Sequence, residues 1–100
     1  MKIKHISQEW LKLEIKKILN KYLDKSFQGF FFGSRIRGDN FERADIDIGI
    51  EGHQAIPIAK KLGIKEDLEK LPTLYKFDLV DFKTVSSDFK KEAFKYRELI

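Results

Sequence analysis

The spacing of apolar residues along the chain predicts three helices. Over residues 8–23 an apolar stripe recurs at helical intervals behind Ser7, a suitable N-cap, and consists of Leu11, Ile15, Ile18, Leu19 and Tyr22. Residues 55–70 show a second helical pattern, with Pro57 near its first turn. A third helix is expected after Ser86 or Ser87, with apolar positions at Phe89, Ala93, Tyr96 and Ile100.

Three other segments have the pattern of β-strands. Residues 27–32 are rich in phenylalanine and end at Gly33, and residues 75–82 are expected to form a third strand. Residues 44–50 alternate strictly, so that isoleucines share one face while Asp45, Asp47 and Gly49 share the other. The element order α-β-β-α-β-α predicts an α/β (α+β) fold, with a small mixed sheet and helices on one of its faces.

Composition indicates a single globular domain spanning residues 1–100. The chain is 42% hydrophobic and 36% charged, and its apolar runs are too short to span a membrane. It has no cysteine, which excludes disulfides and thiolate metal sites, and no secretory signal is visible, so we expect a cytoplasmic protein. The net charge is +4, but the lysines are scattered without interleaved aromatic residues, which argues against nucleic-acid binding.

The alternating strand places two carboxylates where they could bind a metal ion. Asp45 and Asp47 lie on the same face, roughly 6.6 Å apart along the strand. Hard oxygen ligands at this separation suit Mg²⁺, which keeps water and substrate phosphates among its ligands. A third carboxylate would come from the strand YKFDLVDF, in which Asp78 and Asp81 point to opposite faces. Alternation alone does not choose between them.

A candidate phosphate-binding segment precedes these aspartates. Gly33 permits a close backbone approach, Ser34 offers a hydroxyl, and Arg35 and Arg37 can neutralise phosphate charge. Taken singly, a Gly-Ser pair is most often a turn and an Asp-x-Asp strand is most often a solvated face. Their combination favours a site for a metal ion and a phosphate group.

The combined motif resembles a known signature. Gly33-Ser34, ten residues and then Asp45-Ile46-Asp47 match the GSx10DxD pattern of the DNA polymerase β-like nucleotidyltransferase superfamily. More closely, FGSRIRG, ADIDIGI and LPTLYKFDLVDF are similar to segments of its minimal nucleotidyltransferase (MNT) family, and the similarity covers nearly the whole chain.

The resemblance implies a polymerase β palm-like core with assigned roles for the motif residues. Gly33 and Ser34 would bind a nucleoside triphosphate, while Asp45 and Asp47 would hold Mg²⁺. The third catalytic carboxylate would be Asp78, which could also accept the proton of the attacking hydroxyl.

The resemblance also implies a partner. MNT proteins commonly pair with helical HEPN proteins, often ribonuclease toxins, and some act as antitoxins by moving AMP from ATP onto a tyrosine of that toxin. In the alternative reading, the chain neutralises its HEPN-type partner by complex formation without catalysis. A hundred residues leave little room for an acceptor-binding domain, so another chain or a second copy in a homo-oligomer would supply it.

Overall fold

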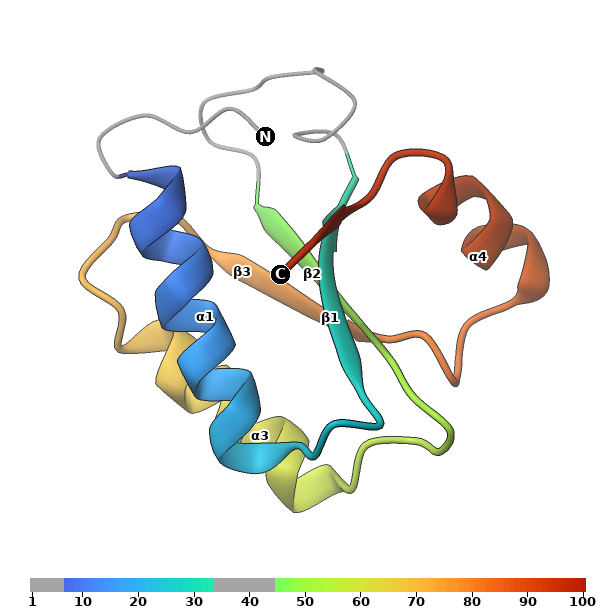
Figure 1. Cartoon of the computed structure of the whole chain (residues 1–100), viewed down its shortest axis with the longest axis horizontal. Helices are drawn as coiled ribbons and strands as arrows, with labels where there is room; N and C mark the ends of the chain where they lie inside the picture. The colour runs from blue at the N-terminus through green and yellow to red at the C-terminus, as the bar shows by residue number, and fades with distance from the viewer. Residues whose placement is uncertain (1–6, 34–44) are drawn as a thin grey trace.

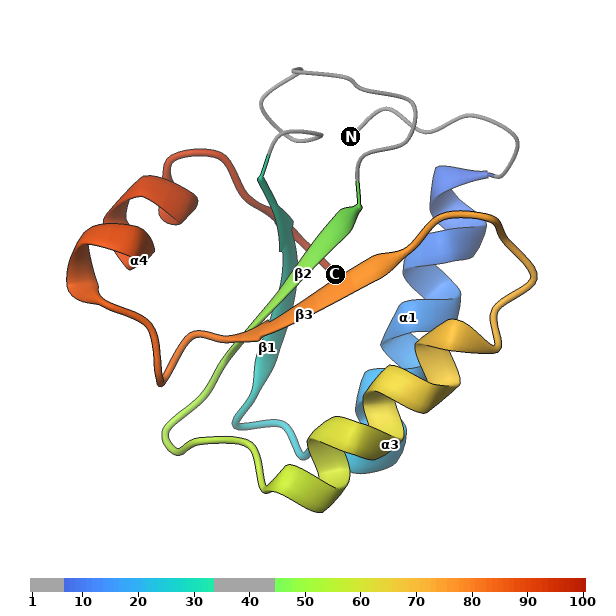
Figure 2. The same cartoon turned by 180° about the vertical axis from the view of Figure 1, so that it is seen from behind.

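The computed structural model describes residues 7–33 and 45–100, and in this part of the chain it shows three helices and one four-stranded sheet. In chain order the elements are α1 (Gln8–Tyr22), β1 (Gln28–Phe32), β2 (Ile46–Glu51), α3 (Ile58–Glu69), β3 (Phe77–Asp81), α4 (Ser87–Phe94) and β4 (Glu98–Leu99) (Figures 1 and 2). None of the described helices is long and apolar enough to cross a lipid bilayer. The predicted mixed α/β fold is confirmed.

The sheet is mixed, with strand order β3-β2-β1-β4. β2 pairs antiparallel with β1 on one side and parallel with β3 on the other, and β4 pairs antiparallel with the outer edge of β1. The three isoleucines of β2, Ile46, Ile48 and Ile50, are all buried, as their alternation predicted. Because β2 is flanked on both sides, its register with β1 and β3 determines which side chains meet on each face of the sheet.

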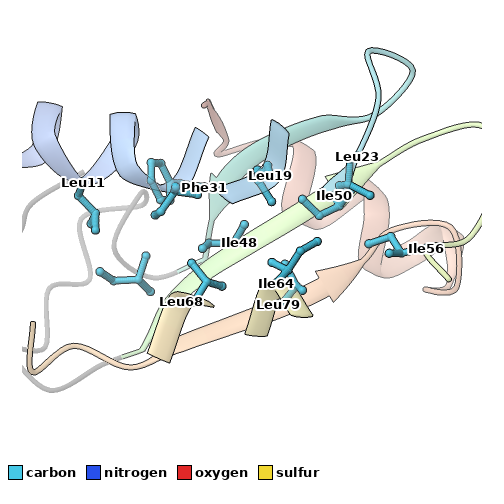
Figure 3. Packing of buried hydrophobic residues seen from close by; sticks show 12 residues of the cluster. Leu11, Leu19, Leu23, Phe31, Ile48, Ile50, Ile56, Ile64, Leu68 and Leu79 are labelled. Carbon is cyan, nitrogen blue, oxygen red and sulfur yellow. The ribbon is translucent and has the colours of Figure 1, made fainter. Parts of the chain in front are cut away.

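Helices α1 and α3 cover the isoleucine face and form the main core with it. Figure 3 shows Leu19 of α1 and Ile64 of α3 near Ile48 and Ile50 of β2; these four residues and Leu11 of α1 are buried in one apolar cluster. The Ser7 hydroxyl accepts a hydrogen bond from the Trp10 amide at 3.2 Å, so the predicted N-cap of α1 is confirmed.

The opposite face of the sheet carries an aromatic cluster under α4. Phe30 and Phe32 of β1 pack with Phe82, and Phe94 of α4 stacks on Phe82 with ring centroids 5.7 Å apart. Gly49 lies beneath these rings, and a Cβ there would lie 2.5 Å from the Phe30 ring. The expectation that helices cover only one face was therefore incomplete, because β1 and β3 carry apolar side chains on both faces.

The final helix ends earlier than its apolar spacing predicted. Ser86 caps α4 by accepting a hydrogen bond from the Phe89 amide at 3.1 Å, but the helix ends at Phe94. The chain then reverses, and Leu99 pairs with Phe30 as part of β4. The Ile100 amide donates to the Gly29 carbonyl at 3.0 Å, so pairing with the edge of β1 replaces the last helical turn.

Candidate active site

Asp47 and Asp78 lie side by side at the same level of two neighbouring strands. They are register partners in the parallel pairing of β2 with β3. Neighbouring strands run about 4.8 Å apart, and register partners project to the same face of a sheet. Asp47 is half-buried and Asp78 is exposed, so both carboxylates border solvent on the face opposite α1 and α3.

Asp81 lies on the other face of β3, where its carboxylate binds backbone amides. Its side chain is only 4% exposed. One carboxylate oxygen accepts a hydrogen bond from the Ile56 amide at 2.8 Å, and the other accepts from the Lys83 amide at 2.9 Å. Asp81 thus ties the segment before α3 to the end of β3, and Asp78 is the aspartate of this strand that lies beside Asp47.

Asp45 lies just outside the strand that carries Asp47. It precedes the first residue of β2 and its side chain is exposed. The Ile46 amide donates to the Lys76 carbonyl at 2.9 Å, which holds the start of β2 against the start of β3. Asp45 therefore lies at the end of β2 where Asp47 pairs with Phe32, the residue before Gly33, but it does not line the cleft described below.

Gly33 makes the close approach to Asp47 that a larger residue would prevent. Its φ of +89° lies in a region that side-chain-bearing residues rarely adopt. A Cβ at this position would lie 2.1 Å from Oδ2 of Asp47, so any side chain would displace the carboxylate. Three predicted phosphate-binding residues, Ser34, Arg35 and Arg37, lie outside the described residues.

The two carboxylates and Gly33 open into one cleft of about 330 Å³. Its sheet side is formed by Phe32, Gly33, Asp47, Asp78 and Val80. The structure thus brings together three of the predicted site residues on adjacent strands of the sheet. A concave site with a few convergent polar groups is the usual form of a small-molecule site.

The other wall of the cleft comes from α4 and the turn after it, which sequence reasoning missed. Phe89, Glu92, Ala93 and Tyr96 line this wall. The helical spacing of Phe89, Ala93 and Tyr96 was visible in the sequence, but it was used only to predict a helix. Phe89 and Tyr96 are 44% and 48% exposed, so the stripe serves the cleft as well as the aromatic cluster.

Ion pairs and ring stacking hold this wall against the sheet. Glu51 at the end of β2 pairs with Lys90 of α4 at 3.1 Å and with Arg97 at 3.7 Å. The Arg97 guanidinium lies 4.2 Å from the centre of the Phe94 ring, a cation–π contact. These contacts lie on both sides of Tyr96 in the chain and restrain the segment that carries it.

The carboxylates fit a magnesium ion that is completed by substrate. Among residues 7–33 and 45–100, no three acidic or histidine side chains converge into a ready-made metal site. Mg²⁺ is commonly held by one or two carboxylates plus water and substrate phosphates, and does not require a full protein cage. The Asp47–Asp78 pair alone supplies the two carboxylates that such an ion needs from the protein.

Comparisons with known proteins identify similar sequences and similar folds. A Haemophilus influenzae protein named "Probable protein adenylyltransferase MntA" is 27% identical over 79% of this chain and 69% of its own length. A crystal structure of a toxin-antitoxin with AMP-PNP superposes with a TM-score of 0.72 at 20% identity, covering 88% of this chain and 70% of that one. A structure of a tri-AMPylated Shewanella oneidensis HEPN toxin in complex with MNT antitoxin gives a TM-score of 0.70 at 19% identity, covering 93% and 71%.

A family model provides the assignment that these distant similarities do not. The model described as polymerase beta, nucleotidyltransferase matches residues 13–100, from the first helix to the end of the chain. The superfamily predicted from the Gly33-Ser34 and Asp45-Ile46-Asp47 motifs is thereby confirmed. This chain belongs to the polymerase beta nucleotidyltransferase family.

Proposed function

We propose that this protein is a Mg²⁺-dependent nucleotidyltransferase that moves AMP from ATP onto a hydroxyl group of a HEPN-type partner protein, as the antitoxin of a toxin-antitoxin pair. The observation that carries the proposal is the register pairing of Asp47 with Asp78 beside Gly33, in one cleft. Membership of the nucleotidyltransferase family gives that arrangement its chemistry.

The residues that connect β1 with β2 are assigned to phosphate binding. Gly33 has no side chain to shield its backbone, and its positive φ lets the chain pass close to Asp47, so a phosphate bound to a metal ion at Asp47 would lie next to this backbone. The Ser34 hydroxyl and the Arg35 and Arg37 guanidinium groups follow it in sequence and complete the triphosphate site. Arginine suits this role because its planar fork matches phosphate oxygens.

The three aspartates divide metal binding and proton transfer. Asp45, Asp47 and Asp78 would hold magnesium, which neutralises charge on the phosphates and aligns them for in-line displacement. Asp78 is the more exposed of the strand-borne pair, and it lines the cleft. It is therefore the carboxylate best placed to accept the proton of an incoming hydroxyl.

Two similar structures support the choice of nucleotide and partner. One contains AMP-PNP with a toxin-antitoxin, and the other contains an AMPylated HEPN toxin with an MNT antitoxin. The H. influenzae relative carries an adenylyltransferase name. We also propose that the protein acts in the cytoplasm, where its substrate ATP is available.

Nucleotide binding tests the first step of this function. The experiment titrates ATP into the purified chain with and without Mg²⁺, using Asp47→Asn as the site variant and Asp67→Asn as the matched control. Asp67 lies on α3, on the other face of the sheet, so the same loss of charge occurs away from the cleft. We expect Mg²⁺-dependent binding that survives Asp67→Asn and is lost in Asp47→Asn. Equal binding by both variants would contradict the proposed site.

A further inference from the structure

Tyr96 shares the cleft with the two carboxylates. It lines the wall opposite the sheet, in the same cavity as Asp47 and Asp78, and the residue is 48% exposed. It lies in the turn between α4 and β4, two residues beyond the end of the helix. A tyrosine at this position places a phenolic hydroxyl at the edge of a nucleotide-transfer site.

The other two tyrosines of the chain have different environments. The Tyr22 hydroxyl donates a hydrogen bond to Asp67 at 3.0 Å, between α1 and α3. Tyr75 packs against the main core under the same helices. Both are on the far side of the sheet from the cleft, so a modification specific to Tyr96 is distinguishable from one at either of them.

The backbone on both sides of Tyr96 is restrained. Before it, Phe94 stacks on Phe82 in the aromatic cluster. After it, Arg97 reaches Glu51 and the Phe94 ring, and Leu99 pairs with β1. A nucleophile held in the same chain as the reacting site has a high effective concentration, because its encounter with substrate requires no diffusion.

We propose that Tyr96 is an internal acceptor, onto which the protein transfers AMP from its own bound ATP when no partner fills the cleft. The inference rests on the proposed function. The Tyr96 phenolic oxygen attacks the α-phosphorus of ATP and forms a new P–O bond. The bond from the α-phosphorus to the oxygen bridging it to the β-phosphate breaks, and pyrophosphate leaves. The phenolic proton passes to the Asp78 carboxylate, so no oxidant, reductant or further reactant is needed.

Transfer of AMP to Tyr96 would block the cleft. AMP attached to Tyr96 would stay within the cleft that the next ATP must enter, since the turn carrying the residue is tied to the sheet at both ends. The modified protein would therefore bind ATP more weakly than the unmodified protein. A partner seated on the cleft would protect Tyr96 and direct AMP to its own hydroxyl group instead.

The test incubates the full chain with ATP and Mg²⁺ without a partner and measures intact mass, followed by peptide mapping. We expect the wild type, Tyr22→Phe and Tyr75→Phe to gain the mass of one AMP, and Tyr96→Phe to gain none. The fraction modified per minute should not change with protein concentration, as an intramolecular step requires. ATP titration of Tyr96→Phe with Mg²⁺, beside the wild type, distinguishes loss of the acceptor hydroxyl from loss of the nucleotide site.

The results that would contradict self-transfer can be told apart from those that would contradict the proposed function. Wild-type protein that binds ATP with Mg²⁺ but gains no mass would overturn the inference and leave the proposed function intact. Equal labelling of Tyr96→Phe, or a modified fraction that rises with protein concentration, would also overturn it. A chain that binds no nucleoside triphosphate at all would overturn the inference and the proposed function together.

Discussion

Asp47 and Asp78 are register partners on adjacent parallel strands, and this relationship organises the site. The two residues are 31 positions apart in sequence (78 minus 47), yet they border the same cleft. Their neighbours along each strand, Ile48 and Leu79, are buried on the other face. The face of the isoleucines is covered by helices, while the face of the two aspartates holds the cleft beside the aromatic cluster.

Replacing Asp78 by asparagine should slow transfer without unfolding the protein. Asp78 is exposed, so the substitution removes a proton acceptor but leaves no buried group unsatisfied. Loss of a general base typically lowers kcat by about 100- to 10,000-fold. Kinetics of AMP transfer, compared with thermal unfolding of the same variant, provide the measurement. An Asp78→Asn enzyme with undiminished kcat would exclude Asp78 as the base.

Replacing Asp81 by alanine should lower the free energy of unfolding, in contrast to replacement of Asp78. The change leaves the Ile56 and Lys83 amides without their carboxylate acceptor at a buried position. Each such loss costs about 1–3 kcal/mol of unfolding free energy. Urea denaturation of Asp81→Ala beside Asp78→Ala measures the contrast. If the two variants were equally stable, the structural role assigned to Asp81 would be wrong.

Substituting Gly33 by alanine should destabilise the folded protein, in part through Asp47. The new methyl group requires a disfavoured φ, at a cost of about 1–2 kcal/mol, and it meets Oδ2 of Asp47. The destabilisation should be smaller in an Asp47→Ala background, where that contact is gone. A double-mutant cycle in urea measures this coupling. If the two changes in unfolding free energy were strictly additive, the contact between residue 33 and Asp47 would not contribute to the destabilisation.

The Lys21–Asp67 contact between α1 and α3 predicts a pH dependence of stability. The hydrogen bond from Lys21, with a further one from Tyr22, holds the pKa of Asp67 below its ordinary value of 3.8. A lowered folded-state pKa stabilises the protein above the ordinary value, and this contribution disappears as pH falls through the lowered one. The pKa of Lys21 is raised above 10.5, chiefly by its hydrogen bond to Asp67, so its contribution is present below that value and is lost at higher pH.

The Asp67→Asn variant tests this linkage. The difference in unfolding free energy between wild type and variant should be constant around neutral pH and should shrink as acid protonates Asp67. Urea denaturation at a series of pH values measures it. A difference that stays constant down to pH values well below 3.8 would contradict the lowered pKa of Asp67.

Local patterns in the sequence predicted much of the fold. The strict alternation around Asp47 correctly placed the β2 isoleucines in the core, and capping residues such as Ser7 marked where helices begin. The same alternation separated Asp78 from Asp81, but it could not say which one lies beside Asp47. That choice depends on the parallel register of β2 and β3, a non-local property that no single strand encodes.

The C-terminal segment shows where local patterns failed. Phe89, Ala93, Tyr96 and Ile100 have helical spacing, yet only the first two lie in α4. Ile100 instead packs against the main core after its amide pairs with Gly29. The edge of β1 competes for this segment with the helix, and tertiary pairing wins. Because that pairing was not foreseen, the cleft wall that contains Glu92 and Tyr96 was not foreseen either.

A transfer assay tests the central claim most directly. ATP labelled at the α-phosphate, with Mg²⁺, is added to a lysate of the organism that encodes the chain, together with Tyr96→Phe protein so that self-labelling does not obscure other bands. A parallel reaction uses Tyr96→Phe combined with Asp47→Asn. We predict a labelled HEPN-type protein in the first reaction and none in the second. Absence of any label, with each of the four nucleoside triphosphates, from a chain that still binds its partner would contradict enzymatic transfer and leave neutralisation by complex formation alone.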